Sequence, residues 1–100
     1  MDFDRDRFAE QIKTRFEITR SEAPAIELEL VEVSELRERP HQLSFSLVFL
    51  APKSSVVEQG LYDLQHESLG DMQLFLVPIG ITDERMMLES VFNFLRENNG

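Results

Sequence analysis

The sequence predicts a mainly β domain with about six mostly antiparallel strands in a small barrel, roll or sandwich, preceded by one short N-terminal helix. Three observations support this fold class. Apolar and polar residues alternate with a period of two over most of the chain after Thr14, as in strands with one buried face. Gly60, Gly70 and Gly80 mark turns between such segments. The length of 100 residues and apolar content of 42% suit a single domain, 1–100, with one hydrophobic core.

The N-terminal segment 4–13 is expected to form the helix. Asp4 or Asp6 can cap its first turn, where the helix dipole favours a carboxylate. Phe8 and Ile12 lie four residues apart and therefore share one face. We expect this face to lie across the sheet and cover it.

Six strands are expected after the helix. The second changes its apolar phase by one residue at Leu30, which indicates a β-bulge. The third becomes continuously apolar at 48–50, so its second half should be buried on both faces. The fifth contains Pro78, which cannot donate to a ladder and predicts an edge, a bulge or a stop. The strands are expected at 14–19, 26–33, 43–50, 61–66, 73–79 and 86–94.

The segment 34–42 is the most polar stretch, and we expect a long connection there because Pro40 prevents a helix from continuing. Arg37, Arg39 and His41 make it a candidate interaction loop, since long polar loops often carry function. The alternative is a solvated connection whose ion pairs contribute little. The tail 95–100 is expected to fray.

The formal charge of −9 argues against nucleic acid and anionic membranes as partners, because both are bound through Lys and Arg. No apolar run is long enough to cross a bilayer, and the first residues are too charged for a signal peptide. We therefore expect a cytoplasmic protein. The acidic row Glu27, Glu29 and Glu32 is interpreted as a solvated strand face, and the acid excess serves either solubility or docking of a basic partner.

Neither a metal nor a cofactor is expected. The chain has no Cys, and its glycines never approach the spacing of a phosphate-binding loop. A zinc site would need both histidines, His41 and His66, together with acids brought close by the fold.

His66 and Tyr62 form a candidate polar pair, because they share one strand face with Leu64. The simpler interpretation is a histidine near a turn whose ring nitrogens bond nearby backbone. The alternative is that His66 acts as a general base beside the Tyr62 hydroxyl. The sequence offers no acid near His66 that could orient its ring, since Asp63 points to the opposite face of the strand.

A set of short motifs runs through most of the chain in a fixed order. They are Phe8, Phe16-Glu17-Ile18, Leu43-x-Phe45-Ser46-Leu47-Val48-Phe49 before Pro52, Gly60-x-Tyr62-x-Leu64-x-His66, Leu69-Gly70, Phe75-Leu76-Val77-Pro78-Ile79-Gly80 and Val91-Phe92-Asn93. In these motifs the chain resembles an uncharacterised family of small bacterial domains. The resemblance implies no activity and no catalytic residue; it implies an accessory or binding role alongside tail-collar or microcystin-dependent-like proteins. The turn before Phe16 departs from the family, since Lys13-Thr14 stands where a Gly is expected.

Three functions follow as hypotheses. The first is a non-catalytic protein-interaction or accessory domain, monomeric or dimeric, since sheet edges can bind a partner strand. The second is a small-ligand-binding barrel, although eight Phe in so short a chain would fill the interior. The third is a small hydrolase-like enzyme using His66, which the absence of a catalytic constellation makes the weakest.

Overall fold

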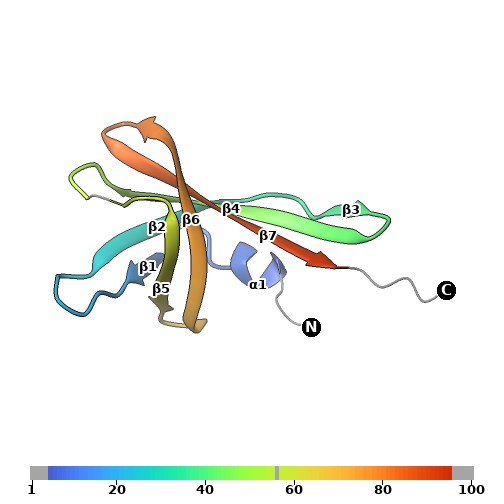
Figure 1. Cartoon of the computed structure of the whole chain (residues 1–100), viewed down its shortest axis with the longest axis horizontal. Helices are drawn as coiled ribbons and strands as arrows, with labels where there is room; N and C mark the ends of the chain where they lie inside the picture. Colours follow the sequence, from blue (N-terminus) through green and yellow to red (C-terminus); the bar gives the residue numbers. More distant parts are fainter. Residues whose placement is uncertain (1–4, 56, 96–100) are drawn as a thin grey trace.

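The computed structural model of the chain describes residues 5–55 and 57–95. Within these residues seven strands form one antiparallel sheet, preceded by a short helix (Figure 1). The elements are α1 (Arg5–Ala9), β1 (Arg15–Ile18), β2 (Ile26–Val33), β3 (Arg37–Arg39), β4 (Gln42–Pro52), β5 (Gly60–His66), β6 (Gly70–Thr82) and β7 (Arg85–Leu95).

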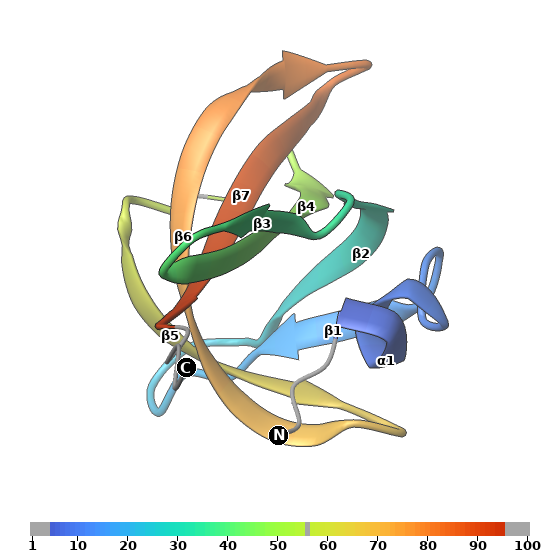
Figure 2. The ribbon, with the colours of Figure 1, turned by 90° about the vertical axis from the view of Figure 1, so that its right-hand side faces the viewer.

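Six of these strands close into a barrel, and the seventh, β3, extends it. The order is β2-β1-β5-β6-β7-β4, and a pairing between β2 and β4 completes the ring. Figure 2 shows the strands around a common interior, with α1 at one side of the ring. The predicted fold class is confirmed, and among barrel, roll and sandwich the structure is a barrel. Closure removes most free sheet edges from so small a domain.

The connection expected over 34–42 needs a correction, because it contains strand β3 and the start of β4. Arg37–Arg39 pairs with the first residues of β4, and Pro40 with His41 forms the two-residue turn between them. The polar composition concealed this strand, since a short edge strand needs no buried face of its own. Together β3, residues 42–45 of β4 and residues 92–95 of β7 form a projection that we call the arm (Figure 1).

Two register shifts occur where the sequence indicated them. The pairing of β2 with β4 shifts between Leu30 and Glu32, which confirms the bulge expected from the phase change. The pairing of β6 with β7 shifts between Pro78 and Gly80, so the proline occupies a bulge. Each bulge lets a strand that pairs with one neighbour in its first half turn toward another in its second.

The interior is filled by large apolar side chains from every barrel strand. Phe16 packs edge-on against Phe49 at a ring-centroid distance of 5.2 Å, and both are fully buried. Of the residues 48–50, predicted to be buried on both faces of their strand, Val48 and Phe49 are buried and Leu50 is partly buried. The other core residues are Phe8, Ile18, Ile26, Leu28, Leu30, Phe45, Ala51, Val57, Leu64, Leu74, Leu76 and Leu88. These side chains leave little room for a ligand inside the barrel.

The described part of the helix is shorter than the predicted 4–13, and position 4 lies outside the described residues. Lys13 adopts a φ of 76°, in the left-handed region that glycine favours, and this residue turns the chain from α1 into β1. A glycine expected at this turn is thus replaced by a strained lysine. Phe8 anchors α1 through contacts with Phe45 and Phe92 at centroid distances of 6.3 and 5.5 Å.

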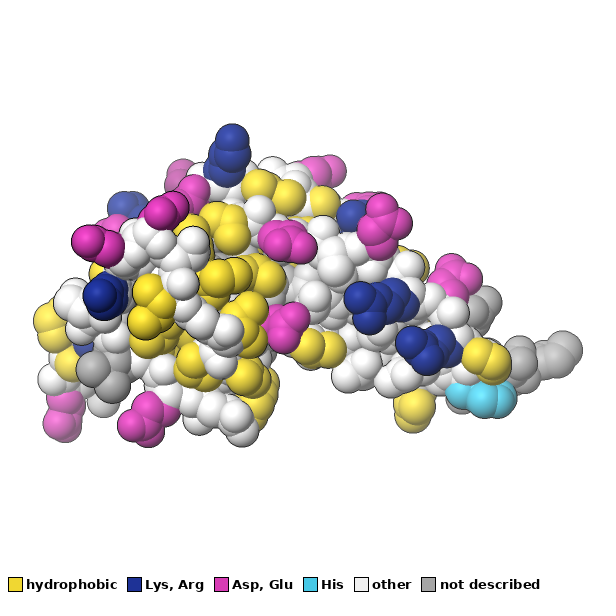
Figure 3. All heavy atoms as spheres, turned by 90° about the horizontal axis from the view of Figure 1, so that it is seen from above, with side chains coloured by type: hydrophobic (Ala, Val, Ile, Leu, Met, Phe, Trp, Pro, Cys, Tyr) yellow, Lys and Arg dark blue, Asp and Glu magenta, His cyan; other side chains and the backbone are white. Residues whose placement is uncertain are grey.

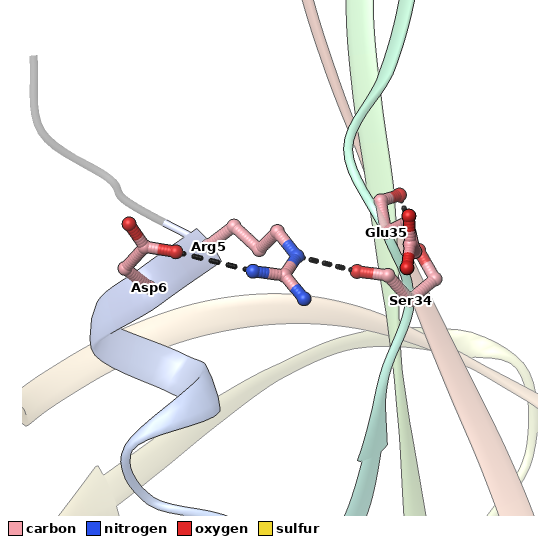
Figure 4. Close-up of polar contacts among 4 residues, drawn as sticks. All are labelled: Arg5, Asp6, Ser34 and Glu35. Carbon is pink, nitrogen blue, oxygen red and sulfur yellow. Dashed lines mark hydrogen bonds and ion pairs between the residues drawn. The ribbon is translucent and has the colours of Figure 1, made fainter.

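Arg5 ties the helix to the end of β2. Its Nε donates to the Ser34 carbonyl oxygen at 2.6 Å, and its Nη1 pairs with Asp6 at 3.1 Å (Figure 4). Ser34 also joins β4, because its hydroxyl accepts from the Ser46 amide at 2.9 Å. The helix therefore covers one mouth of the barrel through one aromatic and one guanidinium anchor.

None of the helices in the described ranges is long and apolar enough to cross a membrane. Of the tail predicted over 95–100, only Leu95 is described; it ends β7 and is 91% exposed.

Candidate functional site

His66 ends β5 and caps the turn into β6. Its Nδ1 accepts hydrogen bonds from the backbone amides of Ser68 and Leu69 at 3.0 and 3.1 Å. Gly70 ends this turn with a φ of 82°, a left-handed backbone conformation that glycine adopts without strain. It pairs with His66 across the hairpin. The expected bonding of the ring to nearby backbone is therefore what the structure contains.

The other ring nitrogen of His66 reaches back to the segment between α1 and β1. Nε2 lies 2.8 Å from the Thr14 hydroxyl, whose own proton goes to the Gln11 carbonyl oxygen at 2.7 Å. Since Nδ1 uses its lone pair to accept, Nε2 carries the proton and donates to Thr14. His66 therefore cannot accept a proton from Thr14 in this arrangement, and the pair is a clasp between two distant segments.

The environment of His66 favours the neutral imidazole. The residue is 7% exposed, and its ring lies against Phe16 at a centroid distance of 4.2 Å. Burial lowers the pKa of His66 below its ordinary value, and the Glu67 carboxylate opposes part of this effect.

A polar groove of about 710 Å³ opens beside this clasp. Among the described residues that line it, Arg15 is the one cation, whereas Glu17, Glu67 and Asp71 supply three carboxylates. No carboxylate of the described residues hydrogen-bonds the His66 ring, so the groove offers hydrogen-bonding groups without an oriented acid–base pair. The remaining lining residues are Gln11, Thr14, Gln65, His66 and Ser68.

The structure does not bring Tyr62 and His66 together. Both face inward along β5 with Leu64 between them, as predicted, but Tyr62 donates its hydroxyl to the Glu58 carbonyl oxygen at 2.6 Å. The two side chains thus form hydrogen bonds at opposite ends of β5. Over residues 5–55 and 57–95, no three His, Asp or Glu side chains converge to hold a metal ion.

The acidic row of β2 lies on the outside of the barrel. Glu27 pairs with Arg15 at 3.4 Å, and Glu29 pairs with Arg85 at 2.9 Å. Such exposed pairs contribute little to stability, which agrees with a solvated strand face.

Arg37, Arg39 and His41 lie on the arm and are exposed. The two arginines alternate with Glu38, so they point to the same side of β3, while His41 sits in the following turn. Figure 3 shows Lys and Arg side chains gathered on the arm, beside a body where acidic side chains predominate. The three candidate residues are therefore presented together on a projecting part of the molecule.

An exposed apolar surface on β5 and β6 was missed by the sequence analysis. Leu61 and Phe75 are cross-strand partners on the outer side of the barrel, 62% and 46% exposed. Ile79 follows on β6 and is also 46% exposed. We call Leu61, Phe75 and Ile79 the β5–β6 patch. The available signal was that 73–79 carries apolar residues on both of its faces, more than a half-buried strand requires.

These features define a small closed antiparallel β-barrel domain with a projecting three-stranded arm. The chain belongs to the family described as domain of unknown function DUF6916, which matches residues 3–92. The resemblance to an uncharacterised family is thereby confirmed. No curated protein matches the chain. No solved structure matches it either.

Proposed function

We propose that this domain is a non-catalytic protein-binding module that docks its partner through the β5–β6 patch. The observation that carries this proposal is the pairing of Leu61 with Phe75 on the outer side of the barrel. Large contiguous apolar patches exposed to water are rare on monomeric proteins and mark interaction sites. A hydrophobic area is visible on the body in Figure 3.

The charges around the patch select the kind of partner. β5 and β6 contain Asp63 and Asp71 but neither Lys nor Arg. Glu89 lies opposite Val77, next to Phe75 on the same outer side. We therefore expect the occupant to be a protein surface of apolar side chains bordered by Lys or Arg. A second copy would set Asp63 and Glu89 against like charges.

A display library of random peptides panned on the intact protein tests this proposal. We expect enriched peptides to combine apolar and basic residues, and a synthetic consensus peptide to shift the backbone NMR signals of Leu61, Phe75 and Ile79. The double variant Leu61→Ser/Phe75→Ser should lose binding by at least about tenfold. Leu36→Ser removes an exposed apolar side chain of the 34–36 segment and serves as the control.

Peptides that bind the double variant as well as the wild type would overturn this proposal, as would shifts confined to other strands. The association with tail-collar-type proteins stays a prediction, because the family description names no partner. A small-ligand role is less well supported, since the barrel interior is packed with side chains. An enzymatic role is also less well supported, since both ring nitrogens of His66 are engaged.

A further inference from the structure

The outer side of β4 and β7 carries a regular pattern that the proposed function does not use. β3 flanks the first part of β4 and β2 flanks its second part, so both occupy one column beside β4. We call the outward side chains of this three-column surface the β4–β7 face. From the arm toward the body its rows are Arg39–Gln42–Leu95, Arg37–Ser44–Asn93, Ser46–Val91, Glu32–Val48–Glu89 and Glu29–Leu50–Met87.

The two ends of this face carry opposite charge. The side chains of Arg37 and Arg39 make no hydrogen bond or ion pair with any described residue, whereas those of Arg15 and Arg85 are each paired with a carboxylate. Glu32 likewise has no ion pair within the described ranges. In a chain with a formal charge of −9, the arm end of the face is locally basic and the body end acidic.

We infer that the β4–β7 face binds the same face of a second copy around a two-fold axis through the row of Ser46 and Val91. This axis lies between the two faces and runs at right angles to the strands. It sets each column of one copy opposite the same column of the second copy, with the facing strands running in opposite directions. Arg37 then faces Glu32 of the second copy, and Arg39 faces Glu29. Both contacts occur twice by symmetry.

The apolar residues of the β7 column obey the same symmetry. Leu95, 91% exposed, lies in the β7 column and faces Met87 of the second copy. Val91, 54% exposed, meets its own equivalent at the axis. Asn93 faces Glu89 and can donate a hydrogen bond to its carboxylate. The two outer columns thus meet side chains of complementary chemistry, whereas in the β4 column Gln42 faces Leu50 and Ser44 faces Val48.

Other arrangements of two copies lose this match. An axis parallel to the strands would exchange the two outer columns, so that Arg37 would face Asn93 and Glu32 would face Glu89. Like charges opposed across an interface in this way are unfavourable. Aligned face-to-face packing of two sheets leaves about 10 Å between them, a gap that an Arg and a Glu side chain span together. Glu29 already pairs with Arg85, so the contact of Arg37 with Glu32 should dominate.

Charge exchange tests the inference with the chain alone. Sedimentation equilibrium should show a wild-type dimer whose dissociation constant rises at least about tenfold in Arg37→Glu and in Glu32→Arg, because each variant opposes like charges twice. A mixture of the two variants should form a heterodimer, since Glu at position 37 then faces Arg at position 32, and the native Arg37 faces Glu32. Carrying both substitutions in one chain should restore the homodimer.

Lys53→Glu, which makes the same charge change at an exposed site outside the face, is the control and should leave the dimer intact. A wild-type protein that stays monomeric into the millimolar range overturns the inference. Failure of the two variants to associate with each other overturns it as well. Leu61→Ser/Phe75→Ser should not change the dimer, so the inference and the proposed function fail or hold separately.

Discussion

Thr14 and His66 are joined side chain to side chain at 2.8 Å although 52 positions separate them in the chain. The contact links the exit from α1 to the end of β5, and the same ring holds the β5–β6 turn through two backbone amides. One buried imidazole therefore fixes two loops relative to each other. Its role in this arrangement depends on the ring being neutral, since Nδ1 must keep a lone pair to accept.

Replacing His66 should lower the free energy of unfolding, because the ring accepts two backbone hydrogen bonds. His66→Leu keeps much of the volume but leaves the amides of Ser68 and Leu69 without an acceptor, at a cost of about 1–3 kcal/mol. His66→Asn should lose less, because its side-chain oxygen can accept from amides two and three residues ahead. Urea unfolding at neutral pH measures both.

The matched control for this series is His41→Leu, at an exposed position in the turn of the arm. It should change the free energy of unfolding by no more than about 0.5 kcal/mol. Equal losses in His66→Leu and His66→Asn would contradict the assignment of the ring as an acceptor for the turn.

Stability should fall as the pH is lowered through the range in which His66 is protonated only in the unfolded chain. Burial lowers the pKa of His66 in the folded protein from the ordinary histidine value of 6.5, so the unfolded chain binds the extra proton first. The stabilising contribution is complete above 6.5 and is lost as the pH falls toward the folded pKa. The difference in urea midpoint between wild type and His66→Asn should therefore shrink on acidification from about pH 7.5 to 5. A difference in urea midpoint that does not change with pH would contradict this linkage between His66 protonation and stability.

The sequence allowed the barrel strands to be predicted because their burial alternates along the chain, and the phase change at Leu30 indicated the bulge that the structure contains. At Pro78 the sequence allowed an edge, a bulge or a stop, and the structure contains a bulge. It did not allow β3 to be recognised, since that strand is held by its pairing with β4 and buries nothing itself. The end of α1 depends on the left-handed backbone of Lys13, a conformation that the residue type does not favour.

The candidate surfaces were harder to predict because they depend on register between strands. Leu61 meets Phe75 only because the β5–β6 turn sets that pairing, and the alternation of apolar residues in each strand does not specify this register. The contact of Thr14 with His66 likewise requires β1 to lie beside β5, which no local pattern encodes. The charge of Arg37 and Arg39 makes them candidates, but their common direction follows from strand β3, where the sequence predicts a polar connection.

Phe8→Ala should release α1 from the barrel mouth while the strands remain folded. Phe8 is 6% exposed and packs on Phe45 and Phe92, and a helix of five residues has no stability of its own. We expect a loss of about 3–5 kcal/mol in the free energy of unfolding, typical of a buried Phe. Amide hydrogen exchange should rise sharply at the helix and stay slow in β4 and β7. Uniform loss of protection across the barrel would show instead that α1 is required for the strands to fold.

Glu84→Gly should stabilise the protein at the β6–β7 turn. Asp83 and Glu84 have φ values of 46° and 64°, so this two-residue hairpin turn is of the type that favours Asp-Gly. Relief of the left-handed strain at Glu84 should exceed the entropy that glycine adds to the unfolded chain, for a net gain of about 0.5–1 kcal/mol. Glu22→Gly, at an exposed bend without positive φ, brings only the entropic cost and should destabilise. Thermal unfolding distinguishes the two, and a melting temperature lowered equally by both substitutions would contradict the strained turn.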